Sequence, residues 1–260
     1  MLLAALTGGD VGRLQDRVVV VTGASSGIGE AIARRCVQEG ARVVAVGRRA
    51  APLDRLVADY GRAAVVPVTV DLTDDGSCDR VSAEAMSTFG RIDGAVHAAG
   101  TVRRGEDIRE TTDAELSRHL DENLGAALRL ARSVIGPMLE AGGGSLVFLG
   151  SQLAIVGAPG YASYTAAKGG VTALARALAV DHGPGGVRVN VLAPGVVRTP
   201  MAYVDRPQFD ELVGSIAERH PLRRIGDPED MAGPAVFLLS DDSGWMTGHT
   251  LVVDGGFTIQ

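Results

Sequence analysis

A tyrosine and a lysine four positions apart are the residues of this sequence best suited to chemistry. Tyr164 and Lys168 flank the run Thr-Ala-Ala, and Lys168 is the single lysine among 25 basic side chains. Residues at this spacing share one face of a helix, where an ammonium favours the phenolate form of a tyrosine. A tyrosine tuned in this way acts as a general acid. The spacing can also arise by chance, so the surrounding motifs decide between the two interpretations.

A glycine-rich turn near the start of the chain has the composition of a phosphate-binding loop. It lies between an apolar run and an amphipathic helical pattern. Glycines permit close backbone approach, and free N–H groups at a helix start attract a pyrophosphate. The spacing is Gly-x-x-x-Gly-x-Gly rather than Gly-x-Gly-x-x-Gly, so a turn without a ligand is the alternative. The residues expected to bind a dinucleotide here are Gly23, Ser25, Ser26, Gly27, Ile28 and Gly29.

The end of the second apolar run carries two arginines, Arg48 and Arg49, where an NAD-binding fold usually has an acid. A cation suits a 2′-phosphate and therefore favours NADP(H) over NAD(H). The alternative is a solvated arginine pair at a strand end. Asp71 follows the third apolar run. It either meets the adenine edge or only supports the turn before the next helix.

The elements that must position these residues alternate along the chain. Short runs rich in Val and Ala predict strands at 17–22, 42–46, 64–70, 92–97, 145–149, 187–192 and 250–253. Amphipathic stretches predict helices at 27–39, 52–60, 74–89, 112–140, 160–182, 208–219 and 228–240. This pattern is typical of an α/β fold: one Rossmann-type domain at 14–260, with a doubly wound parallel sheet of about seven strands and helices on both faces. We expect residues 1–13 to be a loose extension and the proline-rich stretch 195–226 to be a mobile flap.

Composition excludes several classes of protein. A length of 260 residues with 46% hydrophobic side chains suits one large core. The net charge of -6, with acidic and basic residues interleaved, argues against a nucleic-acid partner. Cys36 and Cys78 form no metal-binding or disulfide pattern, so we expect free thiols and no metal. The apolar opening is too short for a signal peptide or a membrane span, and a cytoplasmic protein is expected.

Together, these motifs resemble the short-chain dehydrogenase/reductase family from about Gln15 to Phe257. The resemblance also rests on an asparagine at 123, on a serine at 151, thirteen residues before Tyr164, on Asn-Val-Leu-Ala-Pro-Gly at 190–195 with a threonine at 199, and on Asp-Gly-Gly at 254–256. One motif departs: the family's Asn-Asn-Ala-Gly reads His-Ala-Ala-Gly at 97–100. We expect His97 to fill a bracing position at the end of its strand, and assign it no role in catalysis.

The resemblance implies an NAD(P)-dependent oxidoreductase that interconverts a ketone and a secondary alcohol, with Tyr164 as general acid. Lys168 would also hydrogen-bond the nicotinamide ribose, Ser151 would stabilise the substrate oxygen, and Asn123 would hold water in a proton relay. Without the resemblance, Ser151 is a turn serine and Asn123 is structural. Further cofactor contacts are expected at Leu72, Ala99, Gly100, Pro194, Gly195, Val197 and Thr199.

Pocket residues are predicted only by their closeness to the motifs: Gln152, Leu153, Tyr161, Val196, Met201 and Phe209. Their mixed character suggests a substrate with apolar bulk and one polar handle. A 3-oxoacyl reductase acting on a carrier protein or CoA thioester is one alternative, and Arg129 is a position such enzymes can use for the carrier. A catalytically silent nucleotide-binding regulator is another, which the intact Ser151, Tyr164 and Lys168 argue against. Family members are often homotetramers, with a dimer as the alternative.

Overall fold

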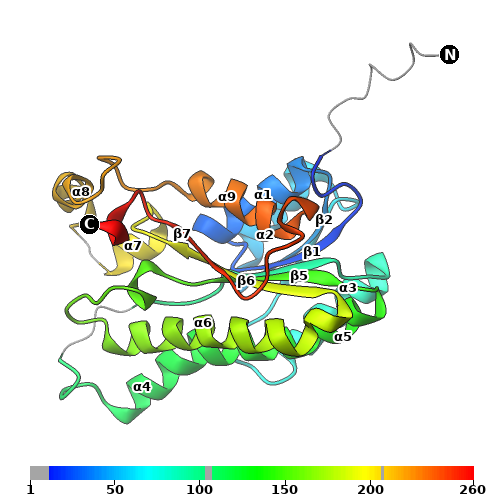
Figure 1. The fold of residues 1–260 in the computed structure, drawn as a ribbon. Coiled ribbons are helices and arrows are strands. Elements are labelled where there is room, and N and C mark those ends of the chain that lie inside the picture. The colour runs from blue at the N-terminus through cyan, green and yellow to red at the C-terminus, as the bar shows by residue number, and fades with distance from the viewer. Residues whose placement is uncertain (1–11, 103–106, 206–207) are drawn as a thin grey trace.

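The computed structural model describes residues 12–102, 107–205 and 208–260 and contains one parallel sheet (Figure 1). The strand order is β3-β2-β1-β4-β5-β6-β7, and every neighbouring pair is parallel. The strands are β1 Val18–Thr22, β2 Arg42–Gly47, β3 Val65–Thr69, β4 Gly94–His97, β5 Gly144–Leu149, β6 Val187–Pro194 and β7 Thr250–Val253. The predicted doubly wound sheet is confirmed.

Helices cover both faces of the sheet and enclose two hydrophobic cores (Figure 1). One face carries α1 Gly27–Gln38, α2 Ala50–Tyr60 and α9 Pro228–Leu239, and the other carries α3 Ser77–Phe89, α5 Ala126–Glu140 and α6 Ala162–His182. The strands between them are buried on both faces, which explains why they read as nearly continuous apolar runs. The helix predicted at 52–60 begins two residues earlier, and that at 74–89 begins at Ser77.

The helix predicted at 112–140 is not uniform. It consists of α4 Asp113–Leu120, a π-helical turn at Asp121–Gly125 and α5. A π-helical turn inserts a wider loop of backbone into a helix and is frequent at functional sites. Periodicity cannot reveal such a turn, because the apolar pattern on either side of it is helical. The turn contains Asn123.

The stretch 195–226 holds two helices where one was predicted. α8 Phe209–Glu218 matches the expected helix at 208–219, whereas α7 Pro200–Asp205 was not predicted. A proline at a first helical position has a favourable φ for starting a helix, and Pro200 occupies that position. Both helices lie at the same end of the molecule as the C-terminus (Figure 1). The motion expected of this stretch stays a prediction, and most of the expected extension at 1–13 lies outside the described residues.

The strand order places β1 and β4 side by side at the centre of the sheet. Chain connections leave these two strands in opposite directions, and the crevice at their carboxyl ends is where doubly wound folds bind ligands. Over the described residues, the structure contains no helix long and apolar enough to cross a membrane.

Candidate functional site

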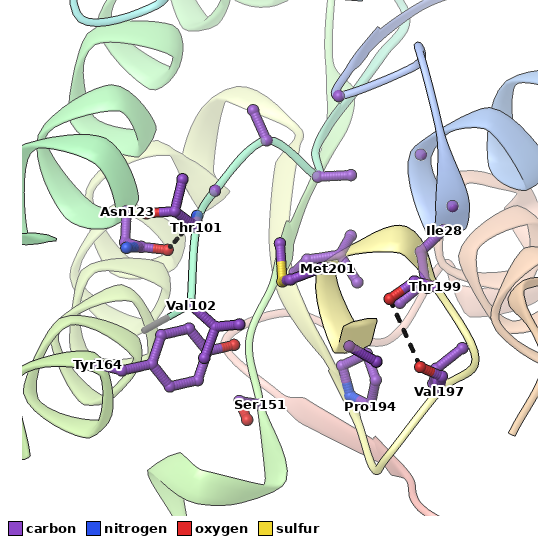
Figure 2. A pocket seen from close by; sticks show the side chains of 18 of the residues that line it. Ile28, Thr101, Val102, Asn123, Ser151, Tyr164, Pro194, Val197, Thr199 and Met201 are labelled. Carbon is purple, nitrogen blue, oxygen red and sulfur yellow. Dashed lines mark hydrogen bonds between the residues drawn. The ribbon is translucent and has the colours of Figure 1, made fainter. Parts of the chain in front are cut away.

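A cavity of about 760 Å³ opens along the carboxyl ends of the strands. Every residue that the sequence analysis assigned to the catalytic set, the cofactor or the substrate lines it. Figure 2 shows Asn123, Thr101 and Tyr164 on one side of this cavity, with Ile28, Thr199 and others on the opposite side. Segments more than 100 residues apart in sequence thus meet in one space.

The glycine-rich turn has a shape that side chains would prevent. Gly23 has a φ of 69°, and a Cβ there would lie 2.9 Å from the backbone of Ala98. A Cβ on Gly29 would lie 2.4 Å from the carbonyl oxygen of Gly23. The side chain of Ser26, the residue before α1, does not cap the helix. The first backbone N–H groups of α1 are therefore not capped by Ser26. A phosphate-binding turn requires such uncapped N–H groups.

Arg48 and Asp71 form the adenosine end of the cavity, where a nucleotide ribose is expected. A guanidinium nitrogen of Arg48 lies 3.7 Å from a carboxylate oxygen of Asp71, and the Arg48 side chain is 66% exposed. The other Asp71 oxygen accepts hydrogen bonds from the backbone and hydroxyl of Thr73. Asp71 therefore supports its turn, one of the two interpretations of this residue. Arg49 instead donates to the carbonyl oxygen of Ser25, 3.1 Å away.

Lys168 is buried in the wall of the cavity, with 4% of its surface exposed. Its ammonium donates to the carbonyl oxygen of Leu149 at 2.9 Å and lies 5.8 Å from the centre of the Tyr164 ring. Burial lowers the pKa of Lys168 to about 8. Tyr164 and Lys168 share a face of α6, as the spacing predicts.

Asn123 is fully buried at the π-helical turn. Its amide nitrogen donates to the carbonyl oxygen of His119 at 3.0 Å, and its amide oxygen accepts from the backbone N–H of Thr101 at 3.3 Å (Figure 2). Gly100 makes this approach possible, because a Cβ there would lie 2.7 Å from the same amide oxygen. The side chain of Asn123 is thus fixed between a helix and the loop after β4.

Thr101 and Glu122 are among the cavity residues that the sequence did not predict. The Thr101 hydroxyl donates to the Glu122 carboxylate, so consecutive residues of the π-helical turn bind one threonine. A signal was present in the sequence: an acidic residue stands immediately before the asparagine at 123. Its partner, however, lies 21 residues away and could not be identified from spacing.

Ser151 follows β5 and caps a short 3₁₀ turn at Gln152–Ala154. Its hydroxyl oxygen accepts from the backbone N–H of Leu153 at 3.1 Å, so the hydroxyl proton stays available to donate elsewhere. Figure 2 shows the Tyr164 ring extending toward Ser151. Ser151 therefore caps a turn and also lines the cavity.

His97 is buried and braces the ends of two central strands. Its Nδ1 lies 3.2 Å from the hydroxyl of Thr22, which also accepts from the backbone N–H groups of Ala98 and Ala99. Burial, with a smaller effect of the Lys168 charge, lowers the pKa of His97 to about 3. An imidazole that stays neutral at physiological pH fits the expected bracing role.

Arg129 is largely buried and contacts other parts of the fold. Its guanidinium donates to the carbonyl oxygen of Leu72 at 3.0 Å and pairs with Asp121 at 2.9 Å. The Asp121 hydrogen bond, the largest cause, raises the pKa of Arg129. These two contacts disfavour the carrier-contact role considered for Arg129.

The flap side of the cavity is formed by α7, α8 and the C-terminal turn Phe257–Ile259. Its wall is largely apolar, with Met201, Phe209, Ile216 and Phe257. Ile216, Phe257 and a cation, Arg219, were not predicted to line the cavity, because only the tertiary fold brings the end of α8 against the C-terminal turn. Across the cavity, Gln152 is 5% exposed. Its amide oxygen has no hydrogen-bond partner among the described residues.

Known proteins similar to this chain are dehydrogenases and reductases. A family model described as "Enoyl-(Acyl carrier protein) reductase" matches residues 23–258. Similar proteins include D-threitol dehydrogenase of Mycolicibacterium smegmatis, 37% identical over 95% of each chain. Galactitol 2-dehydrogenase (L-tagatose-forming) of Cereibacter sphaeroides is 38% identical over 95% of this chain and 97% of its own.

Solved structures of dehydrogenases are also similar to this chain. A putative short-chain dehydrogenase/reductase from Burkholderia xenovorans superimposes with a TM-score of 0.90 and 34% identity, covering 96% of this chain and 99% of its own. The aldohexose dehydrogenase of Thermoplasma acidophilum gives a TM-score of 0.86 at 29% identity, covering 96% and 97%. The chain belongs to the short-chain dehydrogenase/reductase family and is an NAD(P)-dependent oxidoreductase that acts on CH–OH groups.

Proposed function

We propose that the protein uses NADP(H) to interconvert a ketone and a secondary alcohol, with Tyr164 as general acid and base. The observation that carries the proposal is the buried Lys168 ammonium beside the Tyr164 ring, on the wall of a cavity that Ser151 also lines. A buried cation with no carboxylate partner among the described residues is costly, and an enzyme keeps it when the charge serves chemistry.

The cavity fits a dinucleotide. The turn from Gly23 to Gly29 lacks the side chains that would fill it, and the start of α1 can receive a pyrophosphate. In our proposal Ser25, Ser26 and Ile28 line the pyrophosphate site, with Leu72, Ala99, Gly100, Pro194, Gly195, Val197 and Thr199 along the rest of the cofactor. When bound, the nicotinamide supplies or accepts the hydride.

The protein's own residues handle the proton and the developing charge. As the carbonyl carbon gains the hydride, the carbonyl π electrons move to oxygen and Tyr164 gives that oxygen a proton. Ser151 donates a hydrogen bond to the same oxygen, which stabilises the negative charge that grows there. Lys168 stabilises the phenolate left on Tyr164, and Asn123 holds the water through which the proton is replaced.

Arg48 supports NADP(H) over NAD(H). Its side chain is largely exposed at the end of β2, and its only described carboxylate neighbour lies 3.7 Å away. That loose pair leaves guanidinium donors for a 2′-phosphate, which arginine binds well. An enzyme specific for NAD(H) usually has an acid at this position.

The substrate is proposed to be a small molecule with apolar bulk and one polar handle. Gln152, Leu153, Tyr161, Val196 and Met201 contribute to its site. Relatives are named for a polyol such as galactitol and for 2-(R)-hydroxypropyl-CoM, so members of this group take varied secondary alcohols. A carrier-bound 3-oxoacyl substrate is disfavoured by the inward position of Arg129.

Turnover of a panel of secondary alcohols and ketones with both cofactors, followed by the absorbance of the reduced nicotinamide, tests the proposal. Tyr164→Phe should lower kcat by about 100-fold or more while the protein still binds NADPH. Tyr60→Phe is the matched control, since Tyr60 lies outside the cavity and its hydroxyl accepts a hydrogen bond from Gln38. Wild-type rates in Tyr164→Phe would refute the mechanism. Tight NADPH binding without turnover of any substrate would favour the silent regulator.

We further propose a cytoplasmic homotetramer, with a dimer as the alternative, and no nucleic-acid or membrane partner. Trp245 is fully exposed, and Val180 on α6 is 77% exposed, so apolar surface is available for subunit contacts. Trp245 therefore lies on the surface of the subunit and does not belong to its core. Both cysteines are buried free thiols, which suits a reducing compartment. Sedimentation equilibrium gives the subunit number.

A further inference from the structure

Arg219 brings a cation to the flap side of the cavity. It stands at the end of α8 and lines the cavity that Tyr164 and Ser151 line. Its guanidinium carbon lies 4.9 Å from the centre of the Phe257 ring, in the C-terminal turn. That ring also packs against His220, 5.2 Å away between ring centres. The cation is therefore positioned by an aromatic surface that is itself fixed.

The neighbouring arginines are already engaged, and Arg219 is not. Arg198 pairs with Asp210 at 3.2 Å, Arg224 binds Asp230 at 2.5 Å, and Arg223 donates to a backbone carbonyl at 2.7 Å. The Arg219 guanidinium has no ion pair among the described residues and contacts the Phe257 ring, while the Arg219 backbone carbonyl accepts a hydrogen bond from the Gln260 side chain.

No acid on the cavity wall compensates this charge. Asp71 and Glu122 are the acidic residues among those that line the cavity, and each accepts a hydrogen bond from a threonine hydroxyl. The wall next to Arg219 is instead apolar, with Phe209 and Ile216 on the same helix. Arg219 itself is exposed, so its guanidinium is accessible to an incoming anion.

We propose that Arg219 binds an anionic group of the substrate, at the far end of an apolar chain from the reacting carbon. This inference rests on the proposed function and specifies its substrate class: a hydroxy or keto compound that carries a carboxylate, sulfonate or phosphate. Arginine is suited to this task because its planar donors bind two oxygens of such a group together. The polar handle expected from the sequence is then an acid.

The test compares keto acids of increasing chain length with their methyl esters, and with matched sulfonates and phosphates. At the best chain length, wild-type enzyme should prefer the acid by about tenfold or more in kcat/KM, chiefly through KM. Arg219→Met should abolish that preference, and Arg219→Lys should restore part of it. Arg223→Met removes an equal charge four residues away, outside the cavity, and should leave the preference intact. The series also identifies which acid is preferred.

A binding measurement separates this inference from the proposed reaction. Calorimetry with octanoate and octanol on protein saturated with NADP⁺ should give tighter binding of octanoate to wild type, and Arg219→Met should lose the difference. Octanoate selectivity without any turnover would support the subsite and refute the proposed reaction. Equal affinity for the two probes, or selectivity that survives in Arg219→Met, would overturn the inference even if ketones are reduced.

Discussion

The ammonium of Lys168 donates a hydrogen bond to the carbonyl oxygen of Leu149, 2.9 Å away. Leu149 ends β5, and Ser151 follows two residues later. This hydrogen bond joins α6, which carries Tyr164, to the strand that precedes Ser151. It helps to hold Tyr164 and Lys168 close to Ser151 at the cavity wall.

Lys168→Arg should retain the charge and lose most of the activity. The lysine is 4% exposed, so a larger planar guanidinium cannot take its place without displacing Tyr164 or the end of β5. We expect kcat to fall by about 100-fold with little change in net charge. Steady-state kinetics give the result, and circular dichroism shows whether the fold survives. Unchanged kcat would mean that the Tyr164 and Lys168 spacing is accidental.

Arg48→Gln should change cofactor preference. If Arg48 binds the 2′-phosphate, its loss should lower kcat/KM for NADPH by about 10-fold to 100-fold and leave NADH within about twofold. Arg49→Gln provides the control, because Arg49 donates to the carbonyl oxygen of Ser25 and is a neighbour of equal charge. Equal losses with both cofactors would contradict the assignment.

His97→Asn should change how stability depends on pH. The unfolded chain protonates this histidine below about pH 6.5, whereas burial, aided by the Lys168 charge, lowers the pKa in the folded chain to about 3. The unfolded state therefore binds the extra proton between these values, and wild-type stability falls as the pH falls through this window.

Asparagine does not titrate, so His97→Asn should lack this loss. Relative to wild type, the variant should gain about 2 kcal/mol of unfolding free energy on going from pH 7.5 to pH 5. Urea unfolding at the two pH values measures it. If the difference between variant and wild type does not change with pH, His97 is not the group responsible.

Thr101→Val should loosen the loop after β4. The substitution leaves the Glu122 carboxylate without its hydroxyl donor, which should cost about 1–3 kcal/mol of unfolding free energy. Activity should fall as well, because the backbone N–H of Thr101 helps to fix the amide of Asn123. Glu122→Gln keeps an acceptor for the Thr101 hydroxyl, so it should lower the free energy of unfolding and the activity by less than Thr101→Val does. A Thr101→Val protein with wild-type stability and kcat would exclude this role.

The sequence predicts the strands well because the central ones are apolar runs buried on both faces by helices. It also predicts the residues around the cavity, since the motifs near Gly23, Ser151 and Tyr164 come from the carboxyl ends of neighbouring strands. Contacts between distant segments could not be predicted. The Thr101 to Glu122 hydrogen bond and the Arg219 to Phe257 contact depend on a π-helical turn and on the C-terminal turn, which leave no periodic signal.

Because Lys168 is the single lysine and lies in the cavity wall, this chain is a single-site target for covalent footprinting of side-chain amines. The sequence has no second lysine, and the pKa of about 8 leaves much of this amine neutral and nucleophilic in mildly alkaline buffer. An acylating reagent that enters the cavity would find one side-chain amine to modify. Mass spectrometry of the peptide that contains residue 168 would then report occupancy of the cavity directly, because a bound dinucleotide should protect the amine from the reagent.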